Sequence, residues 1–444
     1  MCIIVLKIGE YMQYLYLVSL GCTKNLIDSE VMLGKLSSYK VTDDASIADL
    51  IIINTCGFIE SAKQESIETI LQLHQQRKSG STLAISGCLS ERYQQQLQQE
   101  LSDVVDLFTG VGDYDKIDQL VQNKKSQFSS KVYLADGIED RVITGSNYHA
   151  YIKLSEGCNQ QCSFCAIPKF KGKLHSRSVA SVVKEVKALV QKGVYDFSFV
   201  SQDSSSYGRD LGKKDLLLHL IEEVEKIEGV HSARILYLYP STTTKQMVDA
   251  IAQSKVFQTY YDIPIQHIDD MMLKTMKRGA SEKATKELLK YMKQQKDAFI
   301  RTGVIVGHPY ETDSSFEKLY QFIKEFGFNR VSVFEYSDEE DTPAYKMGHK
   351  VLAKKIREYA DRLATITEPD FSQLVAKRFE AVIEGYSQEH DLLLKARPLA
   401  WAYEIDGEVL INDTDDQKIE FEKPYTIEVT EVVGNQPIAK VLCN

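Results

Sequence analysis

The chain has 444 residues, a hydrophobic fraction of 43% and a formal net charge of −10. This length predicts a soluble globular protein of two or three domains, and no apolar run is long enough to span a bilayer. The negative charge is uneven, because residues 380–444 hold 14 acidic and 5 basic side chains, a net of −9. A strongly acidic region repels phosphate backbones and attracts basic surfaces, so direct RNA binding is not expected.

Residues 1–135 alternate apolar runs with helical patterns, which predicts an α/β domain with a parallel sheet. Residues 1–11 are interpreted as an N-terminal extension, with either Met1 or Met12 as the first residue of the protein. The extension lacks the basic region of a signal peptide. The expected strands are 14–20, 49–54, 82–86 and 104–109, and the expected helices are 28–36, 59–76, 91–100 and 113–122. The Lys- and Ser-rich stretch 123–131 is typical of a linker.

Residues 136–378 are expected to form a second α/β domain. The expected strands are 149–154, 196–201, 233–237, 260–264, 299–307 and 330–336, and helical patterns include 181–192, 213–227 and 314–326. Six strand–helix units indicate an incomplete version of the eight-unit (β/α) barrel. In residues 379–444 helical periodicity stops, and turn signals at Asp406-Gly407, Asn412-Asp413 and Gly434-Asn435 predict a small antiparallel β-barrel.

Three cysteines, Cys158, Cys162 and Cys165, follow the first strand of the second domain. Three thiolates can ligate three irons of a 4Fe–4S cluster and leave the fourth iron open to a cofactor or substrate. A zinc clip is the alternative, although structural zinc prefers four ligands. Active sites of (β/α) barrels lie at the C-terminal ends of the strands, where this loop is expected.

Three further cysteines, Cys22, Cys56 and Cys88, each follow an expected strand of the first domain. We call them the upstream cysteines. The carboxyl ends of parallel strands meet at one edge of the sheet, and helix N-termini there favour an anionic group. We therefore expect a second three-thiolate site, with three small buried side chains as the alternative. Cys2 and Cys443 lie outside both sets and are interpreted as incidental. Eight cysteines without an export signal favour the reducing cytoplasm.

The Cys-x3-Cys-x2-Cys run after the first strand of a six-unit partial barrel resembles the radical S-adenosylmethionine (SAM) superfamily. Upstream cysteines and a C-terminal barrel similar to a TRAM domain resemble its methylthiotransferase family. The segments Ser19–Glu30, Asn54–Ala62, Ser201–Asp203 and Tyr207-Gly208 are similar to the branch that methylthiolates an aspartate of small-subunit ribosomal protein twelve. Two positions depart from the family pattern: Lys171 stands where arginine is usual, and Tyr310 where glycine is usual.

The resemblance implies two 4Fe–4S clusters and SAM as cofactors. The cluster on Cys158, Cys162 and Cys165, which we call the radical-site cysteines, would bind SAM. An electron from a reductant protein such as a flavodoxin or ferredoxin would cleave SAM to a 5′-deoxyadenosyl radical. The cluster on the upstream cysteines would supply sulfur, and a further SAM would donate the methyl group. Both open irons would face one cavity. The tRNA-modifying branch is the alternative, and it would need a basic docking face.

Four polar residues at strand ends are expected to meet the cofactor: Gln202 and Asp203, and Gln266 and His267. The alternative is that these residues only cap strand ends or line the wall of the barrel. Lys277-Arg278 resembles a substrate or carboxylate contact, with a solvated helix face as the alternative. The 24 tyrosines and the single tryptophan are expected to serve packing only.

These interpretations converge on a cytoplasmic enzyme. Its expected substrate is a basic ribosomal protein of the small subunit, either alone or within the assembled ribosome. A zinc-stabilised interaction protein without catalysis is the alternative from another class. The sequence singles out no catalytic residue beyond the six cysteines.

Overall fold

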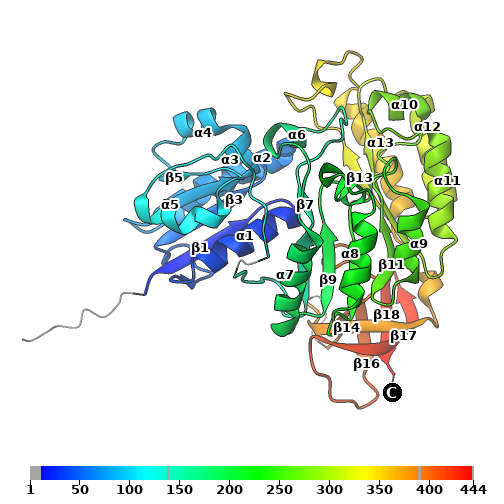
Figure 1. Ribbon diagram of the computed structural model, residues 1–444. Coiled ribbons are helices and arrows are strands. Elements are labelled where there is room, and N and C mark those ends of the chain that lie inside the picture. Colours follow the sequence, from blue (N-terminus) through cyan, green and yellow to red (C-terminus); the bar gives the residue numbers. More distant parts are fainter. Residues whose placement is uncertain (1–11, 138–139, 389–391, 443–444) are drawn as a thin grey trace, which may run out of the picture. The chain divides into compact units, whose positions relative to one another are not determined.

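The computed structural model describes residues 12–137, 140–388 and 392–442, which divide into two compact units (Figure 1). The first unit runs to Tyr133, close to the expected boundary at 135, and also contains Arg141 and the segment Lys169–Gly172. The second unit contains the other described residues, the C-terminal barrel included, so the expected domain boundary at 379 stays a prediction. Cys2, Cys443 and residues 1–11 lie outside the described residues.

The first unit is built on a five-stranded parallel sheet with the order β2-β1-β3-β4-β5. Every residue of β3 is buried, and its near-continuous apolar sequence is typical of a central parallel strand covered on both faces. The strands are β1 (Tyr14–Ser19), β2 (Lys40–Val41), β3 (Leu50–Thr55), β4 (Thr82–Gly87) and β5 (Leu107–Phe108). The helices are α1 (Thr23–Lys35), α2 (Glu60–Gln76), α3 (Cys88–Arg92), α4 (Gln94–Glu100), η1 (Tyr114–Lys116) and α5 (Ile117–Asn123). The α/β prediction for this part of the chain is confirmed.

Several details of the first unit differ from the sequence prediction. Strand β2 was not predicted, the strand expected at 104–109 is shortened to Leu107–Phe108, and the helix expected at 113–122 is divided into η1 and α5. Helix α1 begins at Thr23 rather than at residue 28, because polar side chains in its first turns are buried and used as partners. The helix expected at 91–100 is split at Tyr93, whose ψ of 35° interrupts the helical geometry. The segment 123–131 is not a free linker, since Ser126 and Ser129 bind the Phe108 N–H and the Asp113 carboxylate.

The second unit contains a six-stranded sheet in the order β13-β12-β11-β10-β9-β6, and all neighbouring strands are parallel. The strands are β6 (His149–Lys153), β9 (Asp196–Val200), β10 (Ser232–Ile235), β11 (Phe257–Asp262), β12 (Phe299–Val306) and β13 (Arg330–Glu335). The helices that follow them include α7 (Val179–Gln191), α8 (Leu216–Glu225), α9 (Lys245–Gln253), α11 (Glu282–Lys293), α12 (Asp313–Phe326) and α13 (Ala353–Thr367). Strands in sequential order with helical crossovers confirm the partial (β/α)6 barrel.

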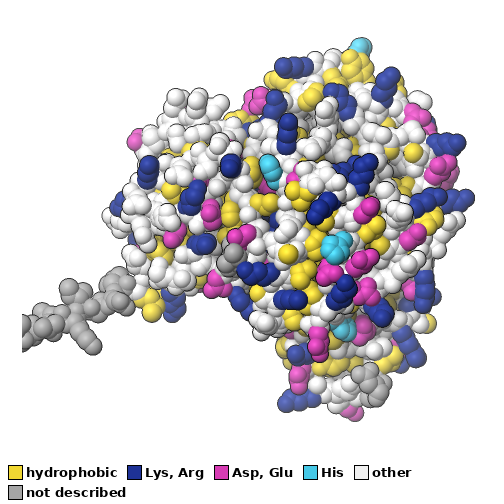
Figure 2. Space-filling view, viewed as in Figure 1, with side chains coloured by type: hydrophobic (Ala, Val, Ile, Leu, Met, Phe, Trp, Pro, Cys, Tyr) yellow, Lys and Arg dark blue, Asp and Glu magenta, His cyan; other side chains and the backbone are white. Residues whose placement is uncertain are grey.

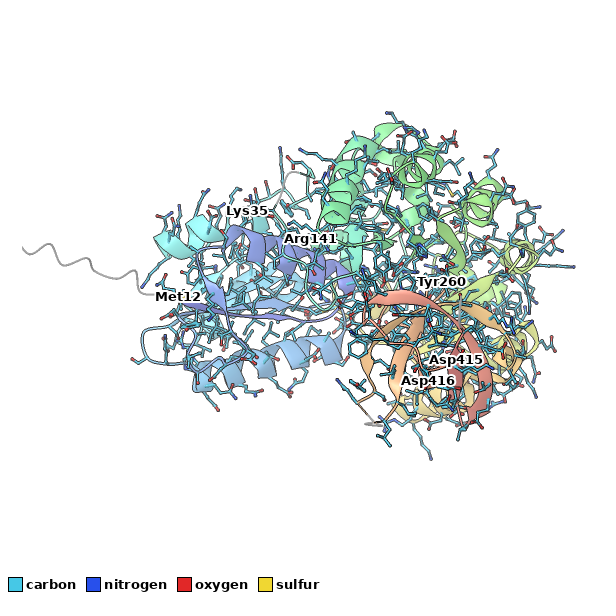
Figure 3. All side chains as sticks on the ribbon, turned by 90° about the horizontal axis from the view of Figure 1, so that it is seen from below. Met12, Lys35, Arg141, Tyr260, Asp415 and Asp416 are labelled. Carbon is cyan, nitrogen blue, oxygen red and sulfur yellow. The ribbon has the colours of Figure 1, made fainter. Side chains whose placement is uncertain are left out.

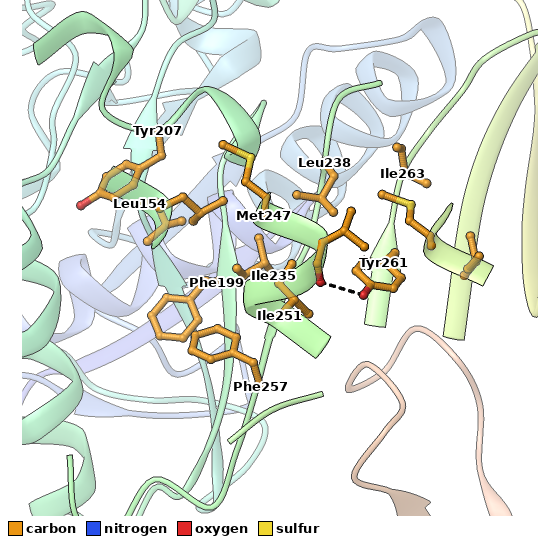
Figure 4. Close-up of a cluster of buried hydrophobic side chains, with 14 of the residues drawn as sticks. Leu154, Phe199, Tyr207, Ile235, Leu238, Met247, Ile251, Phe257, Tyr261 and Ile263 are labelled. Carbon is orange, nitrogen blue, oxygen red and sulfur yellow. Dashed lines mark hydrogen bonds between the residues drawn. The ribbon is translucent and has the colours of Figure 1, made fainter. Parts of the chain in front are cut away.

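Between this sheet and its helices lies a continuous apolar core (Figure 4). Phe199 of β9 stacks on Phe257 of β11 with ring centroids 5.5 Å apart. Tyr261 reaches across to α9, where its hydroxyl donates a hydrogen bond of 3.0 Å to the Val248 carbonyl. Such a buried hydroxyl needs a partner, and this bond fixes α9 against the sheet.

The chain ends in a closed five-stranded barrel with the order β14-β15-β16-β18-β17. Its strands are β14 (Arg378–Tyr386), β15 (Leu394–Pro398), β16 (Val409–Asp413), β17 (Lys423–Val433) and β18 (Gln436–Val441). All pairs are antiparallel except β16–β18, which is parallel. The turn expected at Asn412-Asp413 is wrong, because these residues end β16. The left-handed turn residues are Asp415 and Asp416, which lie side by side in Figure 3.

The barrel packs against the N-terminal ends of the partial-barrel strands within the second unit. Asp196, the first residue of β9, binds both Arg397 of β15 and Arg234 of β10 at 2.8 Å, and all three side chains are buried. Arg330, the first residue of β13, donates to the Asp406 carbonyl at 2.7 Å. The C-terminal ends of the strands are thus at the opposite end of the sheet from the barrel.

On the face shown in Figure 2, acidic and basic side chains are interspersed with hydrophobic ones. None of the helices formed by the described residues has both the length and the apolar character needed to cross a membrane.

Candidate functional site

The radical-site loop follows β6 and the short strand β7 (Ser155–Glu156). Its central residue, Ser163, is held from three directions. The Ser163 N–H donates to Met276 O at 3.0 Å, and its carbonyl accepts from Ala344 N at 2.8 Å. Its hydroxyl lies 3.0 Å from Nε2 of His308. Burial lowers the pKa of His308 to about 4, so the ring is neutral and Nε2 accepts while Nδ1 donates to the Pro309 carbonyl.

Each sulfur of the radical-site cysteines has an N–H donor. Gln160 N donates to Cys158 Sγ at 3.4 Å, and Arg278 Nη1 donates to Cys162 Sγ at 3.2 Å. A backbone hydrogen bond from Ile167 acts on the Cys165 sulfur. Such donors stabilise thiolates and tune the metal that the thiolates hold.

The protonation of the free thiols also fits a metal site. Burial raises the pKa of Cys158 and of Cys165 to about 12, and the charge of Cys162 adds to both shifts, while the Arg278 guanidinium opposes them. The three cysteines thus lie close enough to interact electrostatically with one another. At neutral pH the metal-free thiols of Cys158 and Cys165 are protonated, and a metal centre would displace those protons on binding. The residues present fit a three-thiolate iron–sulfur cluster.

Two of the expected cofactor contacts lie on the loop after β9. The Asp203 carboxylate accepts from Gln160 Nε2 at 2.8 Å and from the hydroxyls of Ser205 at 2.7 Å and Ser206 at 2.6 Å. Asp203 thus fastens its own loop to the cysteine loop. Gln202 donates through Nε2 to the Glu156 carboxylate. Its Oε1 is buried and has no partner among the described residues.

The other two expected contacts, Gln266 and His267, follow β11. Gln266 has a φ of +69°, and its Oε1 is likewise buried and unpartnered in the described part of the chain. His267 is fully buried, with Nδ1 accepting from Asp269 N at 3.0 Å and Nε2 lying 3.2 Å from Glu311 Oε1. His267 is therefore a fully hydrogen-bonded wall residue, whereas the two glutamines each keep one free acceptor oxygen.

The packing role expected for the tyrosines does not describe Tyr239. Its hydroxyl lies 3.4 Å from Cys162 Sγ, and the Arg278 guanidinium stacks on its ring at 4.1 Å. Tyr239 follows β10 at the end of the sheet where barrel sites lie. This position after a strand is the sequence signal from which its place in the site could have been predicted. Arg278 is buried, which excludes the solvated helix face. Trp401 does serve packing, since it lies against Phe371.

The upstream cysteines of the first unit lie in three loops that touch one another. Cys22 directly precedes α1, Cys56 follows β3, and Cys88 is the first residue of α3. A Cβ placed on Gly21 would be 2.6 Å from Cys56 Cβ, and one placed on Gly57 would be 3.1 Å from the Cys88 carbonyl carbon. Only glycine permits these approaches. The structure thus brings the three cysteines together at the carboxyl edge of the sheet.

One side chain bridges all three upstream loops. Asn25 Nδ2 donates to Leu20 O at 3.0 Å and to Thr55 O at 3.1 Å, and Asn25 Oδ1 lies 3.6 Å from Cys88 Sγ. Burial raises the pKa of Cys56, with neighbouring Cys22 contributing. The N-terminus of α1 adjoins Cys22, and helix N-termini favour negative charge. In the metal-free chain the Cys88 thiol donates to Asn25 Oδ1. The position of the three cysteines at one sheet edge, beside a helix N-terminus, is what fits a three-thiolate cluster.

Helix α1 carries two buried ion pairs about two turns beyond Cys22. Lys171, from the segment Lys169–Gly172, lies 3.7 Å from Asp28. Arg141 Nε donates to Glu30 at 2.8 Å, and Figure 3 shows Arg141 beside α1. The lysine that departs from the family pattern therefore keeps a carboxylate partner. At the second departure, Tyr310 has a φ of +71°, a region that glycine occupies without strain.

In comparisons with known protein families, the two parts of the chain match two different family models. Residues 14–110 match the model of the uncharacterized protein family UPF0004, and residues 152–323 match the radical SAM superfamily. The fold is similar to that of the radical S-adenosylmethionine methyltransferase TsrM from Kitasatospora setae, at a TM-score of 0.53 and 13% identity, covering 75% of this chain and 74% of that one.

Full-length relatives are much more similar in sequence. A protein of Sulfurovum sp. (strain NBC37-1) named ribosomal protein uS12 methylthiotransferase RimO is 60% identical over 432 residues, which cover 96% of this chain and 98% of that protein. A Campylobacter jejuni (strain RM1221) protein of the same name is 50% identical over 434 residues, covering 97% and 99%. The chain belongs to the RimO family of radical SAM methylthiotransferases.

Proposed function

We propose that this protein replaces a hydrogen on the β-carbon of an aspartate of ribosomal protein uS12 by a methylthio group. The observation that carries the proposal is the pair of three-cysteine sites, one in each compact unit, at the carboxyl ends of parallel strands. One iron–sulfur site suffices to generate a radical. A second site is what sulfur insertion adds to that chemistry, and full-length relatives carry the matching name.

The chain matches the radical SAM superfamily, and its cofactors are therefore an iron–sulfur cluster and SAM. We assign that cluster to the radical-site cysteines and a second 4Fe–4S cluster to the upstream cysteines. When bound, these groups supply one-electron chemistry for removing hydrogen from an unactivated carbon, together with the sulfur and the methyl group. The two sites must therefore reach the same substrate carbon.

The chain's own residues orient the cofactor. The free Oε1 atoms of Gln202 and Gln266 are acceptors for the amino and hydroxyl groups of SAM, because a buried acceptor without a partner carries a desolvation cost that a ligand donor removes. Asp203 and Ser163 hold the cysteine loop to neighbouring loops beyond the strand ends. His267 and its partner Glu311 close the wall beside Gln266.

The acidic C-terminal segment favours a basic protein as substrate. Residues 380–444 carry a net charge of −9, which complements a basic ribosomal protein and opposes the phosphates of tRNA. Within the second unit, the barrel packs at the N-terminal strand ends, whereas the cysteine loop follows the C-terminal end of β6. The barrel is thus suited to contacts remote from the modified aspartate. We place the reaction in the cytoplasm, with a flavodoxin or ferredoxin as reductant.

The deciding experiment offers the anaerobically reconstituted enzyme three substrates: purified uS12, small ribosomal subunits and tRNA. Mass spectrometry is expected to find the methylthio group on one aspartate of uS12, alone or in the subunit, and none on tRNA. Modified tRNA beside untouched uS12 would instead support the tRNA-modifying branch. A colourless protein that contains zinc and no sulfide would exclude both. The Cys158→Ala enzyme serves as the inactive control.

A further inference from the structure

We propose that Arg278, assisted by Tyr239, raises the reduction potential of the cluster held by the radical-site cysteines through its contact with a single sulfur, that of Cys162. The inference rests on the proposed assignment of that cluster to these cysteines. It gives Arg278 a role different from the substrate or carboxylate contact that its sequence motif resembles. Arg278 is a positioning and tuning residue in this proposal.

The geometry around Cys162 carries the inference. Arg278 is 4% exposed, and its Nη1 donates to Cys162 Sγ at 3.2 Å while Nη2 donates to the Pro264 carbonyl at 2.6 Å. Its planar face stacks on the Tyr239 ring at 4.1 Å. The Tyr239 hydroxyl approaches the same sulfur at 3.4 Å. A guanidinium held on both terminal nitrogens and on one face has a fixed position relative to the sulfur.

The three sulfurs are not equivalent in this arrangement. Cys158 and Cys165 receive backbone N–H donors, from Gln160 and Ile167, and these donors are neutral. Among the described contacts, Cys162 is the one cysteine of the three that has a cationic donor, Arg278. Because the site is buried, the Coulomb interaction between the guanidinium and the sulfur is much less screened than it would be in water.

The sign of the effect follows from charge. Reduction adds one electron, taken from the reductant protein or from dithionite, and makes the cluster one unit more negative without a proton. A nearby cation stabilises the more negative state, and hydrogen bonds to the sulfurs act in the same direction. Arg278 therefore makes the cluster easier to reduce by a weak protein donor.

The same contacts disfavour a direct role in binding the cofactor carboxylate. A bidentate arginine–carboxylate pair uses two parallel N–H groups of a free fork. In Arg278 both terminal nitrogens already bind protein atoms, and the ring of Tyr239 covers one face. Its Nε is left without a partner among the described residues, and a carboxylate binding on that side would have to share a terminal nitrogen with the protein acceptor that the nitrogen already binds.

The test is a redox titration without SAM, followed by electron paramagnetic resonance of the reduced cluster. The titration uses the full-length chain with Cys22, Cys56 and Cys88 replaced by alanine, so that only one cluster contributes. In Arg278→Met, the equilibrium constant for reduction is expected to fall at least tenfold, which is 59 mV for a one-electron couple. Arg278→Lys should recover part of the shift, and Tyr239→Phe should give a smaller decrease.

Lys274→Met is the matched control, because it removes an exposed cation from the neighbouring helix α10 (Asp270–Thr275) without touching a sulfur. Iron and sulfide contents are measured in every variant. An unchanged potential in Arg278→Met with full cluster content would overturn the proposal. Should that variant fail to hold its cluster, unchanged potentials in both Arg278→Lys and Tyr239→Phe would overturn it. Failure of the proposed function shows separately, as a wild-type enzyme that holds its clusters but leaves uS12 unmodified.

Discussion

Asn25 and Cys88 are 63 positions apart in sequence, yet the Asn25 Oδ1 atom lies 3.6 Å from the Cys88 sulfur. The same carboxamide donates to the backbone of the loops that carry the other two upstream cysteines. Helix α1 thereby holds three separate strand ends at fixed spacing. A site whose ligands come from three loops needs such a common partner, since loops by themselves are the most mobile connections of a fold.

Replacing Asn25 by alanine is expected to reduce iron and sulfide at the upstream site and to destabilise the metal-free first unit. The carbonyls of buried Thr55 and half-buried Leu20 lose their donor, and an unsatisfied buried group costs about 1–3 kcal/mol. Metal analysis of the reconstituted protein and thermal unfolding of the metal-free protein measure the two effects. Asn123→Ala, at the exposed end of α5, is the control. Normal metal content together with normal stability would show that Asn25 does not organise the site.

The two cysteine sets are expected to fail differently. Cys162→Ala should abolish reductive cleavage of SAM, measured as 5′-deoxyadenosine released, because the radical site loses a cluster ligand. Cys56→Ala should still release 5′-deoxyadenosine but add no methylthio group to uS12. Equal loss of cleavage in both variants would refute the division of labour between the two sites.

Gln202→Ala and Gln266→Ala are each expected to weaken SAM binding by up to about tenfold. Each removes one acceptor, and a hydrogen bond contributes about 0.5–1.5 kcal/mol. Equilibrium binding of SAM to the reconstituted enzyme measures the change, with Gln321→Ala on the exposed face of α12 as the control. Unaltered affinity in both variants would assign the two glutamines to the wall of the barrel rather than to the cofactor.

The ion-pair network at the N-terminal strand ends predicts acid sensitivity. Burial alone would raise the pKa of Asp196, but the Arg234 and Arg397 guanidinium groups outweigh it and hold the pKa well below its usual value. The unfolded chain therefore binds the proton first as the pH falls, so this stabilisation is complete above the unfolded pKa of about 4 and is lost progressively below it.

Asp196→Asn should remove the stabilisation at every pH, at a cost of about 3–5 kcal/mol, because two buried arginines lose their anion. Urea unfolding across neutral and acidic pH measures this, with the exposed Asp416→Asn as the control. The difference between wild type and Asp196→Asn should shrink as the pH falls below about 4. A constant difference would mean that Asp196 does not titrate with folding.

The sequence predicted the strands, and the positions of both cysteine sets after strands, because these signals are local. Apolar runs such as Leu50–Thr55 identify a buried strand, and a cysteine directly after such a run must lie at the sheet edge. The contact of Arg278 with Cys162 spans 116 positions, and only the turn after α10 places the two together. Lys277 in that turn has a φ of +56°, which its sequence does not signal.

Hydrogen bonds between residues far apart in the chain could not be predicted from the sequence either. The segment 123–131 has the composition of a linker, but Asp113 recruits Ser129 through its N–H and its hydroxyl. The amino-acid composition of a segment shows that it is hydrophilic, but it does not show whether the segment donates hydrogen bonds to a buried carboxylate elsewhere in the chain. The role of Asn25 was hidden in the same way, because its partners are carbonyls whose residue types do not matter.

Arg141 and the segment Lys169–Gly172 belong to the first compact unit, although the residues around them belong to the second. The first unit is therefore not encoded by one continuous stretch of the gene. A fragment that stops near residue 135 would lack the cations that neutralise Asp28 and Glu30 on α1, and it would leave two buried carboxylates uncompensated beside Cys22. Both cations are present only in a chain that extends past residue 171, and such a chain also contains the loop of the radical-site cysteines.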